Sequence, residues 1–481
     1  MSSVRFLLDS NVFFPLEATK FTNRTDVPAE VLRLFNKLAV TSCLHPAQLV
    51  DINNGKDLLK TDRFRKMYKK YPEIEDPPTT EDVNAADFNG IISKERPGSN
   101  PWVDNQLLYA LFRNAADFLI TEDGEMQVKG RLLKLGDRIM NSLTAKFWAE
   151  RQLGNNPKYH PEVKLQKCHN FSGSESIFDS IRADYLDFDV WFKKCQLNRR
   201  DTLAIYDVDK LPIAVCILNK ANVDGVGTLP AMKLCTFKVA ESFRGVFLGE
   251  ALLREAVKYA RINKQKSIFI TTYPKQTELI RFLGVFGFVQ YSGKNGELVF
   301  SKELTSSTTA YTTPLDYNIK FGPAACQFTA QTWYVPIQPL FADRLMPEAT
   351  EQLMFRLSYC GFSIRKVYLC NAKVKRINSG DTLLFYRSQE RRGIIAVGVV
   401  DEVMTFSKGS PGIIGWTGKR SVYLAGTITA MNAKEVLGIK FRLVDVFLPE
   451  MPLSLFTSHC PQSITQALSL PIHPKLKGLL V

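Results

Sequence analysis

Short apolar runs alternate with amphipathic segments in the first third of the chain. The run "VRFLL" (4–8) predicts a buried strand, and "AEVLRLFNKL" (29–38) has the apolar spacing of a helix. A further predicted helix, 103–113, leads into a second apolar strand, "DFLIT" (117–121). Helices that alternate with apolar strands favour a parallel α/β sheet, whose ligand sites lie at the carboxyl ends of the strands.

Two polar stretches divide the rest of the chain. "RQLGNNPKYHPE" (151–162) is rich in Gly, Asn and Pro, and "TSSTTAYTTP" (305–314) is rich in Ser and Thr; both predict linkers. A chain of 481 residues exceeds one ordinary core. We therefore expect three domains, at 1–150, 160–304 and 315–481.

The middle segment has a strand, a turn and a helix in close succession. The strand "LCTFKVA" (234–240) meets a turn with Arg244 and Gly245, and a helix with an apolar face begins near Leu248. The start of a helix presents free backbone N–H groups and a positive dipole, which favour phosphate. This pattern alone is common to many proteins.

The last segment is a run of apolar strands separated by turns. Such a run predicts a small β-barrel. The predicted strands are "KVYLCNA" (366–372), "TLLFYRS" (382–388), "GIIAVGVVDEV" (393–403), "SVYLAGTI" (421–428) and "KFRLVDVF" (440–447).

The composition is that of an ordinary globular protein, with 45% apolar and 23% charged residues. No apolar run is long enough to cross a membrane, and a signal peptide is not evident, so we expect a cytoplasmic protein. Nine scattered cysteines without a C-x-x-C pair, and only five histidines, disfavour a disulfide framework and a structural zinc site.

Positive charge is concentrated in the last two thirds of the chain. The net charge is +14 overall, but −1 over 1–150, +7 over 151–305 and +8 over 306–481. Nucleic acid or a nucleotide cofactor is a natural partner for such an excess, although many proteins simply carry solvated lysines.

Three carboxylates are expected to meet at one edge of the first sheet. Asp9 and Asp123 each follow a predicted strand, and Asp104 lies near the start of the helix that feeds the second strand. Mutual repulsion would then call for cations between them. For Asp9 alone, capping of the following helix is an alternative explanation.

Residues 1–148 resemble a PIN-domain nuclease, through "LLDSNVF" and "DNQLLYAL…ADFLITED". The resemblance implies an α/β/α fold with a parallel sheet and a ribonuclease that uses Mg²⁺ or Mn²⁺ to activate water. It assigns catalytic and metal-binding roles to Asp9, Asp104 and Asp123, with Thr121 and Asn11 as polar neighbours. For a further metal ligand the sequence offers Asp51, while Gln48 stands where a carboxylate might be expected.

The stretch "KTDRFRKMYKKY" (60–71) interleaves basic and aromatic residues. Charge neutralisation by Lys66, Lys69 and Lys70, with stacking of bases on the aromatic rings, would suit single-stranded RNA. A solvated helix face explains the same residues equally well.

Residues 175–304 resemble the GNAT acetyltransferases, through the strand at 234–240, "FRGVFLGEALL" (243–253), the strand "SIFITTY" (267–273) and a helix ending in "FGF". The resemblance implies acetyl-CoA as cofactor, with its pyrophosphate on backbone amides of a loop and its pantetheine beside a strand. The residues that it assigns to cofactor binding are Phe237, Lys238, Val239, Arg244, Gly245, Val246, Phe247, Leu248 and Gly249.

This segment departs from the GNAT pattern in two places. Phe247 replaces the middle glycine of the loop, and Leu283 stands where a tyrosine often protonates the departing thiolate. Glu241 is then a candidate base with water as the acid, and Tyr273 is a spare proton donor. A fold that binds acetyl-CoA poorly or not at all is the alternative.

The run 377–403 resembles the PUA-like group, which includes ASCH and EVE domains, at Gly380-Asp381, Phe385-Tyr386 and the strand from Ile394 to Val403. Such domains typically recognise RNA or a modified base. One of Phe385 and Tyr386 is expected in the core and the other at the surface. The candidate RNA-binding residues are Tyr386, Arg387, Arg391, Arg392 and Trp416.

Three functions are consistent with these patterns. The first is a metal-dependent ribonuclease joined to an acetyltransferase and an RNA-recognition module, with RNA, including tRNA, and acetyl-CoA as partners. The second has acetyl transfer as the main activity and the PIN-like region as a scaffold. The third is a non-catalytic RNA-binding regulator that senses acetyl-CoA.

Overall fold

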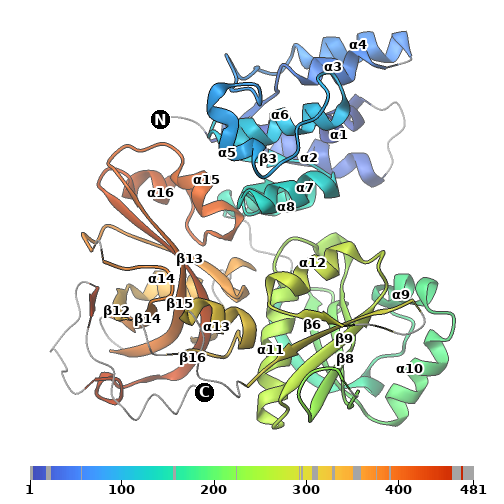
Figure 1. Cartoon of the computed structure of the whole chain (residues 1–481), viewed down its shortest axis with the longest axis vertical. Coiled ribbons are helices and arrows are strands. Elements are labelled where there is room, and N and C mark those ends of the chain that lie inside the picture. The colour runs from blue at the N-terminus through green and yellow to red at the C-terminus, as the bar shows by residue number, and fades with distance from the viewer. Residues whose placement is uncertain are drawn as a thin grey trace. The chain divides into compact units, whose positions relative to one another are not determined.

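The computed structural model of the chain describes residues 4–17, 23–55, 57–154, 159–223, 225–291, 293, 296–305, 313–327, 331–349, 359–374, 376–388, 392–457 and 467–469. The protein is a mixed α/β multidomain chain that divides into two compact units (Figure 1). Unit 1 contains residues 1–156 and 406–434, and unit 2 contains residues 157–405 and 435–481. The predicted division into three domains remains a prediction.

Unit 1 is built on a four-stranded parallel sheet in the order β2-β1-β3-β4. Phe6 and Leu8 of β1 pack with α2 and α8 on one face, and Leu7 packs with α6 on the other. Because successive strand residues point to opposite faces, the continuous apolar run buries both faces. The strands are β1 (Arg5–Leu8), β2 (Thr41–Cys43), β3 (Phe118–Ile120) and β4 (Ile139–Met140), and the helices are α1 (Ser10–Phe13), α2 (Asn23–Leu38), α3 (Gln48–Asn53), α4 (Leu58–Tyr68), α5 (Ala86–Asn89), α6 (Asn100–Phe112), α7 (Gly124–Leu132) and α8 (Ser142–Gln152).

Residues 406–434 complete unit 1 from far along the chain. Their helices are α15 (Ile413–Thr417) and α16 (Ala425–Met431). Arg420 Nε donates to Asp137 Oδ1 at 2.7 Å, and the backbone N–H of Ala425 donates to Gln152 Oε1 at 2.8 Å. The predicted strand at 421–428 is therefore wrong, because its second half begins α16, where the Gln152 side chain accepts a hydrogen bond from the first residue of the helix.

The first sheet of unit 2 has seven strands in the order β10-β11-β9-β8-β7-β6-β5. Only β8 and β9 run parallel; the other neighbours are antiparallel. The strands are β5 (Tyr159–Lys167), β6 (Asp201–Asp207), β7 (Pro212–Lys220), β8 (Ala231–Val239), β9 (Ser267–Thr272), β10 (Val289–Tyr291) and β11 (Leu298–Glu303), and the helices are α9 (Asp179–Asp184), α10 (Phe188–Leu197), α11 (Leu248–Ile262) and α12 (Thr277–Val285).

The second sheet of unit 2 has six strands in the order β13-β16-β15-β14-β12-β17. Closure into a PUA-like barrel remains a prediction. The strands are β12 (Thr332–Ile337), β13 (Arg365–Cys370), β14 (Thr382–Arg387), β15 (Gly393–Phe406), β16 (Val436–Met451) and β17 (Leu468–Ser469), and the helices are α13 (Pro314–Phe321) and α14 (Pro339–Leu345).

Buried polar groups join the two halves of unit 2. Glu250 in the first turn of α11 accepts hydrogen bonds from the backbone N–H groups of Ile364 and Arg365, at 2.8 and 3.2 Å. Lys302 of β11 is 1% exposed, and its Nζ donates to the carbonyl oxygens of Phe286, Ile319 and Lys320, each at 2.7 Å. These bonds offset the cost of burying charge. They fix α11 and the end of α12 against the C-terminal half of the unit.

Candidate functional site

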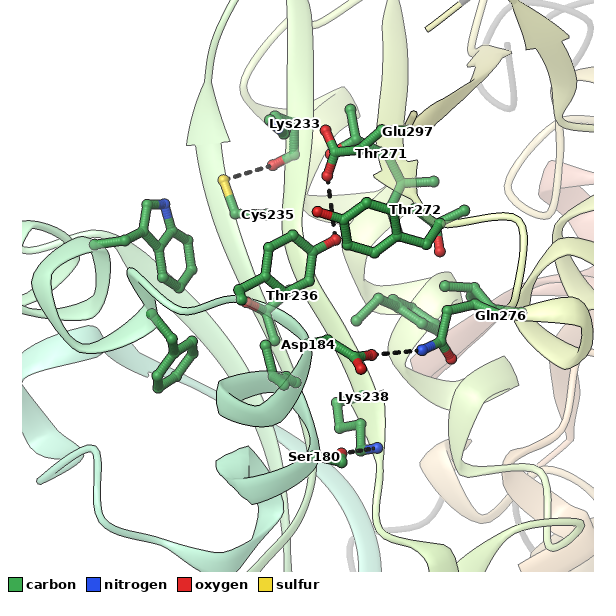
Figure 2. Close-up of a pocket in the computed structure, with 18 of the residues that line it drawn as sticks. Ser180, Asp184, Lys233, Cys235, Thr236, Lys238, Thr271, Thr272, Gln276 and Glu297 are labelled. Atoms are coloured by element: carbon green, nitrogen blue, oxygen red, sulfur yellow. Dashed lines mark hydrogen bonds between the residues drawn. The ribbon is translucent and has the colours of Figure 1, made fainter. Parts of the chain in front are cut away.

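A cavity of about 490 Å³ opens in the seven-stranded sheet of unit 2 (Figure 2). Its floor is formed by β8 and β9, and its walls are formed by α9, α10 and the start of α12. The size and the mixture of aromatic and charged side chains are typical of a site for a small molecule. The residues that line the cavity include Ser180, Asp184, Tyr185, Asp187, Phe188, Trp191, Arg200, Lys233, Cys235, Phe237, Lys238, Tyr273, Gln276 and Glu297.

The cavity lies where the parallel strands β8 and β9 stop pairing. Their register covers only Ala231 to Lys233 on β8, opposite Ser267 to Phe269 on β9. At the same point β8 has a bulge: Leu234 and Thr236 lie opposite consecutive residues of β7, so Cys235 is one residue in excess. The later residues of β8 therefore face the cavity and are not paired with β9.

Polar contacts order the wall of the cavity that α9 provides. Asp184 accepts hydrogen bonds from Lys275 Nζ at 2.6 Å and from Gln276 Nε2 at 2.8 Å, and Lys238 Nζ donates to Ser180 Oγ at 2.5 Å (Figure 2). Burial, with a smaller contribution from nearby Arg244, lowers the pKa of Lys238. Lys238 and Arg244 thus place positive charge at the end of β8 that leads to α11.

Two tyrosines and one acid meet at the end of α9. Tyr185 donates its hydroxyl hydrogen to Glu297 Oε1 at 3.1 Å, and its ring lies 5.0 Å from the ring of Tyr273. Burial and the Glu297 carboxylate raise the pKa of Tyr185, so the phenol keeps its proton at neutral pH. Of these three residues, Glu297 can accept a proton and either tyrosine can donate one.

The loop at 244–249 lies outside the cavity lining and has an unusual backbone. Gly245 has φ +85°, and Phe247, at the N-cap of α11, has φ +65° in the left-handed region. Phe247 therefore takes a conformation that favours glycine, and its side chain is 9% exposed. A Cβ on Gly249 would lie 3.5 Å from the ring of Phe282, which in turn stacks near Phe237.

The remaining residues predicted for the acetyl-CoA site lie around this loop. Phe237 and Lys238 line the cavity, whereas Val239 pairs with Ala214 and Val246 and Leu248 are buried. Glu241 does not line the cavity; its side chain is 74% exposed and forms an ion pair with Arg244 at 3.2 Å. The geometry thus favours Glu297 over Glu241 as a base.

The four carboxylates predicted for a metal site lie near the carboxyl ends of β1 and β3. Asp9 is 4% exposed and accepts a 2.6 Å hydrogen bond from Thr121 Oγ1, itself bonded by Asn11 Nδ2 at 3.2 Å. Burial raises the pKa of Asp9 to about 6, with smaller effects of Asp51 and Asp123. Asp9 occupies the N-cap position of α1 but forms no side-chain cap, so the alternative explanation as a helix cap is wrong.

The other carboxylates are held by separate contacts. Asp51 accepts from Ser10 Oγ at 2.9 Å, and Asp123 caps α7 by accepting from the N–H groups of Glu125 and Met126. Asp104 lies inside α6 and not at its start; burial and the charges of Asp9 and Asp123 raise its pKa to about 7. The expected repulsion among the carboxylates of Asp9, Asp104 and Asp123 is therefore present.

The structure does not support the expected metal site. No group of three or more His, Cys, Asp or Glu side chains in the described part of the chain is placed to hold a metal ion. Protein donors already engage one oxygen of each of two carboxylates, Oδ2 of Asp9 through Thr121 and Oδ1 of Asp123 through the capping N–H groups. Gln48 stands where a metal-binding carboxylate might be expected from the sequence. Its Nε2 atom donates instead to the Leu8 carbonyl oxygen at 2.9 Å and to Ser10 Oγ at 3.2 Å. We derive no metal-dependent step from this site.

The residues predicted to bind RNA are not brought together as an exposed aromatic and basic surface. On α4, Lys66 and Lys69 are exposed, and Lys66 pairs with Asp62 at 2.7 Å, but the interleaved Phe64 and Tyr68 are 7% and 3% exposed and belong to the core. They have no face available for base stacking. Lys70 follows the end of the helix and is exposed.

The predicted RNA site of the C-terminal segment is also altered by burial. Phe385 and Tyr386 are 0% and 5% exposed, so the expectation that one of them lies at the surface is wrong: β14 lies between β12 and β15 and is covered on both faces. Arg387 pairs with Asp343 at 3.0 Å, and Arg392 is exposed. Trp416 belongs to unit 1, half-buried against Phe406, and Arg391 lies outside the described residues.

Comparisons with known proteins give similarities to acetyltransferases. No protein-family model matches the sequence, and no curated protein matches it. A GNAT family acetyltransferase from Elizabethkingia anophelis with acetyl-CoA bound is 15% identical, with a TM-score of 0.23, over 30% of this chain and 98% of that one. The IAA acetyltransferase from Bacillus cereus is 18% identical, with a TM-score of 0.23, over 30% and 100%.

A third solved structure is the PaiA N-acetyltransferase from Thermoplasma acidophilum in complex with coenzyme A. It is 13% identical, with a TM-score of 0.24, over 30% of this chain and 99% of that one. Such low TM-scores and identities give no basis for an activity.

Sequence reasoning missed the residues that give the cavity its chemistry. Tyr185 and Trp191 come from one segment, and Arg200 and Glu297 come from two others, with no common motif. The aromatic run "DYLDFDVWF" (184–192) was the one available signal, and its period is equally typical of a core helix. No helix in the described part of the chain is long and apolar enough to span a membrane.

Proposed function

We propose that residues 157–304 bind acetyl-CoA and transfer its acetyl group to an amine. The observation that carries the proposal is the separation of β8 from β9 beside the Cys235 bulge, with a cavity of about 490 Å³ at that point. Unpaired backbone groups along β8 suit the amides of a pantetheine arm. Acetyl transfer as the main activity, with the PIN-like region as a scaffold, is the alternative that this geometry favours.

The residues around the start of α11 fit the phosphates of the cofactor. Lys238 and Arg244 supply positive charge, and the first turn of α11 has backbone N–H groups beyond the turn at Gly245. Phe247 already holds the left-handed backbone that a glycine would take here, so the loop path is kept while a side chain is added. We therefore expect acetyl-CoA to bind with its phosphates at the solvent-exposed surface of the loop rather than buried within it.

Glu297, Tyr185 and Tyr273 are the residues suited to move protons. Acetyl-CoA supplies a thioester, whose carbonyl carbon forms a bond to the amine nitrogen as its C–S bond breaks. The nitrogen loses one proton, which Glu297 accepts directly or through water, and the sulfur gains one, which Tyr273 or Tyr185 can donate. Leu283, 1% exposed, takes no part.

Calorimetric titration of the full chain with acetyl-CoA, followed by detection of free thiol with an amine panel, tests this function. We expect binding at micromolar to millimolar concentration, weakened about tenfold in Lys238→Gln by loss of a charged contact. Lys258→Gln, exposed on α11, is the matched control. Absence of binding at millimolar acetyl-CoA would show that the fold does not use this cofactor.

The nuclease and RNA-reading roles remain predictions from sequence resemblance. Incubation of the chain with total RNA and Mn²⁺, against an Asp9→Asn, Asp123→Asn double variant, checks the nuclease role. Since the carboxylates do not form a metal-holding group, we expect no variant-sensitive cleavage. Cleavage that is lost in the double variant would restore the nuclease hypothesis.

A further inference from the structure

Two positively charged side chains line the same cavity. Arg200 immediately precedes β6, and Lys233 lies on β8, two residues before Cys235. Lys233 and Cys235 both line the cavity, on either side of the start of the bulge. Arg200 Nη1 lies 3.6 Å from Cys235 Sγ. Both cationic residues therefore lie close to Cys235 along the cavity lining.

The charge of Arg200 is not neutralised by the groups around it. Its NH1 donates to Cys195 Sγ at 3.2 Å and to Cys235 Sγ at 3.6 Å, and its guanidinium carbon lies 6.0 Å from the centre of the Trp191 ring. Burial raises the pKa of both thiols, so they stay uncharged. The Arg200 Nε atom is buried and has no hydrogen-bond partner among the described residues.

The acids near the cavity are engaged elsewhere or lie at its edge. Asp201, next to Arg200, accepts from Lys167 and Tyr259, at 2.7 and 2.6 Å. Asp184 pairs with Lys275, and Glu297 accepts from Tyr185. Asp187 is exposed at the start of α10. Among the described residues, neither Arg200 nor Lys233 has an ion pair with a carboxylate.

We propose that the amine accepted by this cavity carries an anionic group, a carboxylate or a phosphate, which Arg200 and Lys233 bind. This inference rests on the proposed acetyl transfer and adds the chemical class of the acceptor. A guanidinium presents paired N–H donors that match the oxygens of either anion, and an ammonium group adds a second positive charge. Trp191 and Phe188 give the carbon chain between the two groups an apolar wall.

The amine end of the acceptor then points to Tyr185, Tyr273 and Glu297, which line the same cavity. Glu297 is the carboxylate that accepts the amine proton. The acceptor is a small molecule, because the cavity must also admit the end of the pantetheine arm within about 490 Å³.

Matched acceptor pairs test the inference with the full chain. β-Alanine against 3-aminopropan-1-ol tests the carboxylate, and phosphoethanolamine against ethanolamine tests the phosphate. We expect at least one anionic amine to be acetylated with a kcat/KM about tenfold or more above its neutral partner. Arg200→Gln and Lys233→Gln should each raise the KM for that amine about tenfold and leave the acetyl-CoA affinity unchanged. The control variant Lys258→Gln should change neither the KM nor the acetyl-CoA affinity. Arg200→Lys should restore part of the preference.

Direct binding separates this inference from the proposed function. The thermal midpoint of the full chain is measured with each amine in the absence of acetyl-CoA. A rise with an anionic amine that Arg200→Gln abolishes supports the site even if no acetyl group is transferred. If the chain binds acetyl-CoA but acetylates the neutral amines with the same kcat/KM as the anionic ones, the inference of an anionic acceptor is overturned. The proposed acetyl transfer would then still stand. No shift with either anionic amine, together with no turnover, overturns it as well.

Discussion

Replacing Asp9 by Asn should stabilise unit 1 at high pH and leave it unchanged in acid. Asp9 is 4% exposed, and its pKa is raised from 3.8 to about 6. A raised carboxyl pKa means that the folded protein holds the proton more tightly than the unfolded chain. Any stability from this group is therefore complete below pH 3.8 and is lost as the pH rises through about 6.

The size of the effect follows from the difference of about 2.2 pKa units. At 1.36 kcal/mol per unit, ionised Asp9 costs the folded state about 3 kcal/mol at pH 8. Asn removes that charge and its repulsion with Asp51, Asp104 and Asp123, while its amide oxygen still accepts the hydrogen bond from Thr121. Because neutral Asp9 and Asn differ little, the gain should vanish near pH 4.

The assay is thermal unfolding of the full chain at pH 8 and pH 4 in EDTA, with hydrogen exchange of peptides from β1 and β3 to assign the transition. We expect the unit 1 midpoint of Asp9→Asn to rise by about 5 °C or more at pH 8. Asp62→Asn, on the exposed face of α4, is the control for a general charge effect. The reasoning fails if the midpoint at pH 8 is unchanged or lowered, or if the gain is the same at pH 4.

Three further predictions concern other sites. Glu297→Gln should lower kcat about a hundredfold in steady-state acetylation with little change in the acetyl-CoA KM, because a proton acceptor is lost; an unchanged kcat would exclude it as the base. Lys302→Met should lower the free energy of unfolding of unit 2 by about 3 kcal/mol or more in urea titration, because three buried carbonyl oxygens lose their donor; a loss no larger than that of exposed Lys258→Met would contradict it. Gly418→Ala should lower the midpoint of unit 1 more than Gly409→Ala, because both have positive φ but only the first would place a Cβ 2.5 Å from the Asp137 carbonyl oxygen; equal losses would show that backbone strain alone matters.

Local pattern was sufficient for the elements whose burial is complete. The apolar runs predict β1 and β3 to within one residue at each end, and the apolar spacing predicts the start of α11 and the end of α2, because hydrophobic burial decides them locally. α2 begins at Asn23, six residues before the predicted start at 29. The segment 421–428 fails for the opposite reason. Its β-branched and aromatic residues, Val422 and Tyr423, are buried by tertiary contacts rather than by strand pairing.

The candidate site was predictable only in part. Phe237 and Lys238, which the resemblance to GNAT acetyltransferases assigns to cofactor binding, do line the cavity. Arg200 and Glu297 are about a hundred residues apart, and the order of strands in the sheet brings both to the lining of one cavity. Charge pairing was equally hidden: nothing in the sequence distinguishes Arg387, which pairs with Asp343, from Arg200, which has no acidic partner among the described residues.

The discontinuity of unit 1 has a consequence for how the protein is made. The segment 406–434 leaves the ribosome about 250 residues after residue 156, which at 5–20 residues per second is roughly 12–50 s. During this time the nascent N-terminal unit lacks α15, α16 and the partners of Asp137 and Gln152. Its surface there must remain exposed or be held by a chaperone, and completion of unit 1 must await synthesis of most of unit 2.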